Sequence, residues 1–227
     1  MEIDLTLDEL DPAGAICEAH ENVHRDSRAT FLRKATVGGA ALVGALSVVP
    51  AGGSQSANDV DILNYALTLE YLQASFYTEA KRVRALRGKA REAAEVVGAV
   101  ERAHVQALRS ALGSAAVARP TFNFAGVTKD QRQFLKTAVA FEDLAVGAYK
   151  AQAPRIRSKP ILAVAVSIHS VEARHAAWMR RLFGIVPAAS AFDDPVSKPE
   201  ATRIVASTGF ITSSGKTERE AEPRFTG

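Results

Sequence analysis

The sequence predicts an all-α protein, a four-helix bundle with a long crossover between its second and third helices. The composition is 47% hydrophobic but only 7% aromatic, and it is rich in Ala, Leu, Glu and Arg, which favour helices. No strand-like alternation of useful length is present. Glutamates and histidines recur at helical spacing in two similar halves of the chain, which indicates paired helical hairpins.

The most informative pattern is a pair of Glu-x-x-His motifs, Glu101 with His104 and Glu172 with His175. On an α-helix, residues i and i+3 lie on one face about one turn apart. Each motif therefore presents a carboxylate and an imidazole to one point, where they are able to hold one metal ion.

Two lone glutamates complete the set, Glu70 in LNYALTLEYLQASFY and Glu142 in FLKTAVAFEDLAVGAY. Both are buried by pattern among apolar neighbours, where an unpaired charge is costly. From each lone glutamate to the following motif the distance is 31 and 30 residues, and the halves are offset by 72 or 71. If each half is a hairpin, its turn falls near residue 86 or 157, close to Gly88 and to the break at 154–160.

The first predicted helix has a cap at Asn58 or Asp59 and runs to about Arg87. The second runs from about Lys89 to Leu112 and stops at Gly113. The positions expected to face inward share one stripe on each helix. They are Ile62, Leu63, Ala66, Leu67, Glu70, Ala74 and Tyr77 on the first helix, and Ala94, Val97, Glu101, His104 and Leu108 on the second.

The connection from Ser114 to Val127 is much longer than the two hairpin turns and contains Pro120. Fully extended, it would reach about 46 Å at about 3.3 Å per residue. A helix of about 24 residues is only about 36 Å long. The middle connection can therefore cross the whole bundle.

The third predicted helix opens with a capping box, Thr128-x-x-Gln131, and stops near Pro154. The fourth starts around Pro160 and stops at Gly184. Their expected inward residues are Leu135, Ala138, Val139, Glu142, Ala145, Val146 and Tyr149, followed by Val164, Ile168, Glu172, His175 and Met179.

Three further side chains lie near the predicted site. Tyr77 and Tyr149 each follow the lone glutamate of their helix by seven residues, so they share its face two turns along. They are candidates for hydrogen-bond donors to the site or redox-active groups, although the favoured interpretation is core aromatics whose hydroxyls find some partner. His169, three residues before Glu172, is interpreted as a structural or surface histidine.

Residues 1–26 are acidic and poorly periodic, and we predict a disordered leader. Its Cys17, His20 and His24 have spacings that suit zinc, but a solvated tail is preferred because only three good ligands are present. Glu21 and His24 form a third Glu-x-x-His match, which lacks apolar periodicity and a partner carboxylate. Because Cys17 is the only cysteine, no disulfide framework is expected.

Residues 27–57 are predicted to be an export signal, with a basic start at 27–34, an apolar run from Ala35 to Pro50 and small residues at its end. The segment resembles a twin-arginine signal, which predicts an exported protein of the periplasm, cell envelope or extracellular space. Ala29 occupies the position of the second arginine. A membrane-anchored or retained protein is therefore the alternative, although sixteen apolar residues are few for a span.

The bundle is expected to occupy residues 58–186, and 187–227 to form a C-terminal extension with one short helix from Pro199 to Ala206 and a polar tail. Residues 1–34 hold 4 of the 28 Lys and Arg and 8 of the 25 Asp and Glu, which leaves +7 for the rest. This charge predicts weak association with anionic surfaces. Without aromatic platforms, it predicts no specific nucleic-acid binding.

Residues 58 to about 212 resemble the ferritin-like domain family found in secreted bacterial proteins and plant desiccation-related proteins. The resemblance rests on the LTLEYLQASFYTEA segment, the ERAH and EARH motifs, and the AFDDP turn before a short helix. Glu, Glu-x-x-His, Glu, Glu-x-x-His is the ligand order of ferritin-like di-iron and di-manganese bundles. The resemblance implies a ferritin-like four-helix bundle with a dinuclear site formed by Glu70, Glu101, His104, Glu142, Glu172 and His175.

Four carboxylates and two imidazoles form an oxygen-rich site that suits two Fe or two Mn ions and suits copper poorly. Glu101 and Glu172 are the most natural bridging pair, although the sequence leaves the choice open. The resemblance implies no single reaction, since ferritin-like proteins include iron oxidases, oxygen-activating enzymes, manganese catalases and members with no established activity.

The first functional hypothesis is an oxidoreductase that uses oxygen or peroxide in stress protection, either a di-metal oxidase of ferrous iron or a catalase-like enzyme. The second is a non-catalytic stress or desiccation-related protein in which the metal holds the bundle together. Iron storage in a cage is disfavoured, because mineralising interiors are usually acidic. Whether the chain forms a homo-oligomer is left open.

Overall fold

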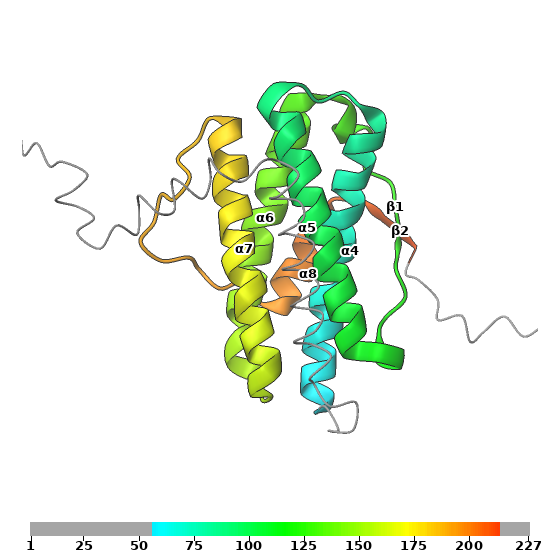
Figure 1. The fold of residues 1–227 in the computed structure, drawn as a ribbon, viewed down its shortest axis with the longest axis vertical. Helices are drawn as coiled ribbons and strands as arrows, with labels where there is room; N and C mark the ends of the chain where they lie inside the picture. Colours follow the sequence, from blue (N-terminus) through cyan, green and yellow to red (C-terminus); the bar gives the residue numbers. More distant parts are fainter. Residues whose placement is uncertain (1–55, 214–227) are drawn as a thin grey trace, which may run out of the picture. The chain divides into compact units, whose positions relative to one another are not determined.

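The computed structural model describes residues 56–213, and four long helices form most of this part of the chain. Helices α4 (Ala57–Val83) and α5 (Gly88–Leu112) form one antiparallel hairpin, and α6 (Gln131–Gln152) and α7 (Lys159–Phe183) form a second (Figure 1). The predicted all-α four-helix bundle is confirmed. The predicted leader, most of the export segment and the end of the polar tail lie outside the described residues.

The connection between α5 and α6 runs along the bundle, as its length predicts (Figure 1). It contains two 3-10 turns, η1 (Gly113–Ala115) and η2 (Val127–Lys129), and the short strand β1 (Thr121–Phe122). Asn64 of α4 holds its first part, because its side chain donates to the Ala115 carbonyl at 2.9 Å and accepts from the Val117 amide at 2.8 Å. The crossover is therefore tied to the outer face of α4.

The ends of α4 differ from the prediction. Ser56, and not Asn58 or Asp59, caps the helix, since its hydroxyl accepts from the Asp59 amide at 3.1 Å. The Asp59 carboxylate instead accepts from the amides of Arg157 and Ser158, at 2.9 and 3.1 Å, in the turn before α7. The helix stops at Val83 and not near Arg87, because the next residue, Arg84, is left-handed with a φ of 59°.

The predicted capping box at the start of α6 is wrong. Asp130 is the cap, and its carboxylate accepts from the Gln133 amide at 2.8 Å. Thr128 donates to Glu79 at 2.7 Å, and the side-chain oxygen of Gln131 accepts from the Arg87 amide at 2.8 Å. Both side chains therefore join α6 to the first hairpin, a tertiary role that local sequence rules do not anticipate.

The C-terminal extension packs on the second hairpin. Helix α8 (Lys198–Ser207), close to the predicted range of 199–206, contacts α6 and buries Ala201 and Val205. Strand β2 (Ile211–Ser213) then pairs antiparallel with β1, a short pairing that the sequence did not predict. Within residues 56–213, no helix combines the length and apolar character needed to cross a membrane.

The predicted inward faces of the four helices form the core. The residues of those stripes are buried, except Val139 and Val164, which are half-buried. One cluster contains the aromatic rings of Phe76, Phe134 and Phe141, and a second contains smaller side chains such as Leu63 and Ala66. Between these two clusters lie the charged side chains of the predicted site.

Candidate metal centre

The six predicted ligands come from four helices and converge in the bundle interior. Each glutamate has an exposed fraction of 0%, while the two histidines, on α5 and α7, are 6% and 5% exposed. Burying so much charge is unfavourable unless a partner compensates it. The residues are Glu70 on α4, Glu101 and His104 on α5, Glu142 on α6, and Glu172 and His175 on α7.

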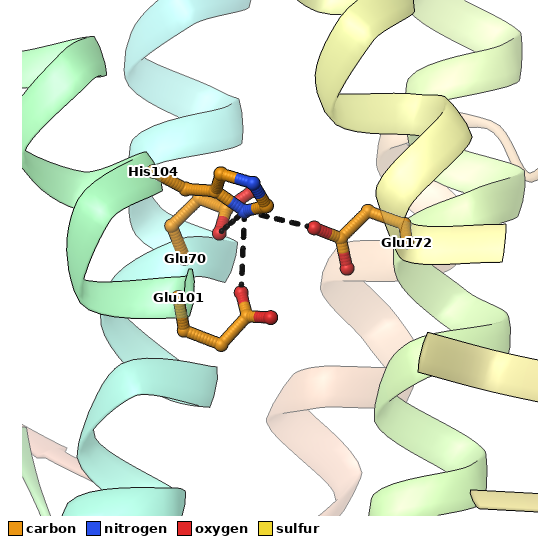
Figure 2. A group of neighbouring side chains, drawn as sticks. All are labelled: Glu70, Glu101, His104 and Glu172. Carbon is orange, nitrogen blue, oxygen red and sulfur yellow. Dashed lines mark ion pairs between the residues drawn. The ribbon is translucent and has the colours of Figure 1, made fainter. Parts of the chain in front are cut away.

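One half of the site surrounds the Nδ1 atom of His104 (Figure 2). This nitrogen lies 3.0 Å from Glu172 Oε1, 3.3 Å from Glu70 Oε2 and 3.6 Å from Glu101 Oε2. Three carboxylates from three helices thus face one imidazole nitrogen.

The other half surrounds His175 in the same way. Its Nδ1 atom lies 2.8 Å from Glu101 Oε1, 3.6 Å from Glu142 Oε2 and 3.9 Å from Glu172 Oε2. Glu101 and Glu172 therefore belong to both halves, and each turns one oxygen to His104 and the other to His175. Two neighbouring ions bridged by two carboxylates require this arrangement.

The donor atoms of both halves fit metal ions. Each half offers four ligand atoms that lie within 4.8 Å of one another. The two Nδ1 atoms and the carboxylate oxygens that face them, among them both oxygens of Glu101 and Glu172, are buried without a hydrogen-bond partner. Since buried polar atoms are almost always partnered, this concentration of free donor atoms is compatible with a metal site.

Both predicted tyrosines reach the site, and they do so across the two hairpins. Tyr149 of α6 donates its hydroxyl to Glu70 Oε1 of α4 at 2.6 Å. Tyr77 of α4 donates to Glu142 Oε1 of α6. Each lone glutamate therefore keeps one oxygen for a tyrosine and directs the other toward a histidine. Of the two interpretations offered by the sequence, the structure supports hydrogen-bond donors to the site.

The protonation of the metal-free site follows from burial and from close charges. Burial raises the pKa of Glu70 to about 7, with a further upward contribution from Glu101 and an opposing one from His104. Burial also raises the pKa of Glu172 well above its usual value. Although burial acts to lower the pKa of His175, the facing Glu101 and Glu142 raise it to about 10. Without metal, the cluster therefore retains protons at neutral pH.

Other candidates stand apart from this cluster. His169 is half-buried on α7 and belongs to neither group of ligand atoms among the described residues. Cys17, Glu21 and His24 lie outside the described residues. Gln73, which the sequence analysis did not single out, is 2% exposed, with its amide nitrogen unpartnered one turn after Glu70. Its i+3 spacing from Glu70 was the available signal.

The fold and the site define a four-helix bundle with a buried carboxylate and imidazole cluster at its centre. The family model described as "Ferritin-like domain" matches residues 58–184, which is more than half of the chain. The chain belongs to the ferritin-like domain family. No curated protein matches it.

Proposed function

We propose that this protein binds a pair of iron or manganese ions and uses them for redox chemistry with oxygen or peroxide. The observation that carries the proposal is the sharing of Glu101 and Glu172 between two histidine-centred groups of ligand atoms. Two separate mononuclear sites would not need shared carboxylates.

The chemistry of the donor set supports iron or manganese. Carboxylate oxygens and imidazole nitrogens suit these metals, whereas copper and zinc sites more often include thiolates or thioethers. Four carboxylates also match the charge of two divalent ions, so that the filled site is close to neutral. A neutral site is far less costly to bury than isolated charges.

When bound, the ions would accept electrons from a donor and pass them to a small oxygen species. The chain's own residues hold the ions, exclude bulk water and fix the ligands. Tyr77 and Tyr149 orient Glu142 and Glu70 and keep a proton at each hydroxyl oxygen, because burial and the adjacent carboxylates raise the pKa of both phenols well above the usual value. In peroxide disposal, two hydrogen peroxide molecules would yield two waters and one dioxygen.

Metal analysis and turnover of matched variants test this proposal. Purified protein should contain about two iron or manganese ions per chain, and it should oxidise ferrous iron or consume peroxide. Glu101→Gln should lose metal and turnover. Glu95→Gln, an exposed position on the same helix, should retain both. Equal turnover in the two variants, at the level of free metal, would remove the proposal.

A second candidate is a non-catalytic stress or desiccation-related protein whose metal stabilises the bundle. The unpartnered carboxylate oxygens favour it, since a bound ion would relieve their mutual repulsion and raise stability. Thermal melting with and without a chelator, measured beside the turnover assay, separates the two. A large loss of stability in a protein with no turnover supports the structural role.

The place of action is proposed from residues 27–57 alone. Their resemblance to a twin-arginine signal supports export, and the site would then act on oxygen species outside the cytoplasm. Ala29 makes retention or membrane anchoring the alternative. Fractionation of cells that express the full chain, with Arg28→Lys as a comparison, tests the location.

A further inference from the structure

A small apolar cavity lies beside the metal centre. It has a volume of ≈ 20 Å³ and opens between α4, α6 and α7. A space of roughly 10–15 Å³ holds one water molecule, so this cavity has room for about one diatomic molecule. Residues of its wall include Ile62, Ala66, Leu69, Ala148, Tyr149 and Ala165.

The cavity is next to one half of the metal centre. Tyr149 is part of its wall, and the hydroxyl of the same residue donates to Glu70 Oε1 at 2.6 Å. Ala66, also in the wall, precedes Glu70 by one helical turn on the same face. A molecule in the cavity therefore lies close to the half of the site that contains Glu70 and His104.

The internal repeat shows that this space is specific to one half. With the offset of 72 residues, Ile62, Leu69 and Ala148 correspond to Phe134, Phe141 and Phe76. Phe76 stacks on Phe134 with ring centroids 4.9 Å apart and meets Phe141 edge-on at 5.2 Å.

These aromatic rings surround Tyr77, the counterpart of Tyr149, and the Phe134 ring centroid lies 5.8 Å from that of Tyr77. Phenylalanines thus fill one half of the repeat where an isoleucine, a leucine and an alanine line a cavity in the other. The difference of three side chains makes the pseudosymmetric bundle functionally one-sided.

We propose that this cavity binds dioxygen and presents it to the Glu70 and His104 half of the metal centre. The inference rests on the proposed redox function and names its oxidant. Apolar cavities stay dry and take up apolar guests, and dioxygen is small and apolar. Hydrogen peroxide would lose its hydrogen bonds to water there, at a cost that an apolar wall does not repay.

The proposal fixes the direction of the chemistry. Two ferrous ions give two electrons to one dioxygen, which takes up two protons from water and leaves as hydrogen peroxide, while two ferric ions remain. The cavity supplies no proton and no electron. Its contribution is to raise the local concentration of dioxygen over that of water and peroxide.

Paramagnetic relaxation by dissolved dioxygen tests the cavity without any turnover. The probe is dioxygen under pressure, and the sample is the full chain loaded with Zn²⁺, which is diamagnetic and redox-inactive. Methyl signals of Ala66 and Ala148 should relax several-fold faster, and the effect should saturate with pressure. Ala138, equally buried and the repeat counterpart of Ala66, is the internal control. Equal relaxation at Ala66 and Ala138 would overturn the proposal.

A filling substitution should abolish the effect. Ala148→Phe introduces the ring that Phe76 supplies in the other half, and Ala140→Phe, at an exposed position on the same helix, is the matched control. If Ala148→Phe does not fold, Leu69→Phe, which copies Phe141, fills the cavity from α4. Persistence of the dioxygen effect at Ala66 in a folded filled variant would contradict the assignment.

Kinetics with two oxidants then separate this inference from the proposed function. In ferrous oxidation, the filled variant should have a KM for dioxygen several-fold higher at unchanged kcat, and its rate with hydrogen peroxide should not change. An equal loss with both oxidants would refute dioxygen delivery. If the wild-type protein oxidises no iron at all, the proposed function fails, while the relaxation experiment still decides whether the cavity takes dioxygen.

Discussion

Tyr149 and Glu70, which are 79 residues apart in the chain, form a buried hydrogen bond of 2.6 Å between α6 and α4. Tyr77 and Glu142 form its counterpart in the opposite sense. The two bonds join the hairpins crosswise, so each hairpin supplies the hydroxyl that orients a glutamate of the other. The metal ligands and the packing of the hairpins are therefore coupled.

Removing either hydroxyl should destabilise the protein. Tyr149→Phe leaves Glu70 Oε1 buried without a donor, which costs about 1–3 kcal/mol. Chemical denaturation of the metal-free protein measures the loss. Tyr71→Phe is the control, since its hydroxyl makes only a 3.5 Å contact with the Val117 carbonyl and should change the free energy of unfolding little. Equal losses at Tyr71 and Tyr149 would contradict the prediction.

The metal-free protein should lose stability as the pH rises. Because the pKa of His175 is raised from 6.5 to about 10, its contribution is complete below 6.5 and is lost as the pH approaches 10. Because the pKa of Glu70 is raised from 4.5 to about 7, the fold favours its protonated form, and stability falls between these values. Glu101, whose pKa is lowered by the two histidines despite burial, opposes the trend only in acid.

Unfolding of chelator-treated protein should therefore become easier by a few kcal/mol between about pH 5 and about pH 9. Metal-loaded protein should show a much flatter profile, because bound ions replace the protons, and metal binding at neutral pH should release protons. Denaturation curves at several pH values, with and without metal, measure both effects. A metal-free profile that rises toward pH 9 would be inconsistent with the cluster described here.

Close packing at Gly98 should limit the size of that residue. A Cβ atom there would lie 2.7 Å from the Cβ atom of Tyr77, across the α4 and α5 interface. Gly98→Ala should therefore destabilise the protein by about 1–3 kcal/mol through overpacking. Helix propensity alone would give a gain of about 1 kcal/mol. Denaturation of the variant decides between the two signs.

The six clustered side chains were predictable because helical spacing and the internal repeat constrain them together. Two i+3 motifs, two lone glutamates and nearly equal intervals leave few ways to arrange four helices around one point. Bridging was only a preference at that stage. The choice of oxygen that Glu101 turns to each histidine depends on side-chain torsions, which the sequence does not specify.

Features that depend on contacts between elements were not predictable. Thr128 and Gln131 match a local capping box, yet their side chains bond to Glu79 and to the Arg87 amide in the other hairpin. Both tyrosines were expected near the site, but their crosswise pairing depends on the antiparallel register of α4 and α6. The left-handed Arg84 ended α4 early without the glycine that usually marks such a stop.

The number of ions bound by variants should follow the sharing of ligands. Because His104 serves one half of the site and His175 the other, His104→Ala should reduce the metal content from about two ions per chain to about one. Glu172→Ala removes a ligand from both halves, so it should reduce the content toward zero. Elemental mass spectrometry after dialysis measures these values.

His169→Ala provides the matched control, because His169 lies one turn before Glu172 on α7 and outside both groups of ligand atoms. It should retain the full metal content. If His104→Ala and Glu172→Ala each lost one ion, the shared position of Glu172 would have no role in binding. A loss at His169→Ala as large as that at His104→Ala would instead place a ligand where the geometry provides none. The graded series thus distinguishes one dinuclear centre from two independent sites.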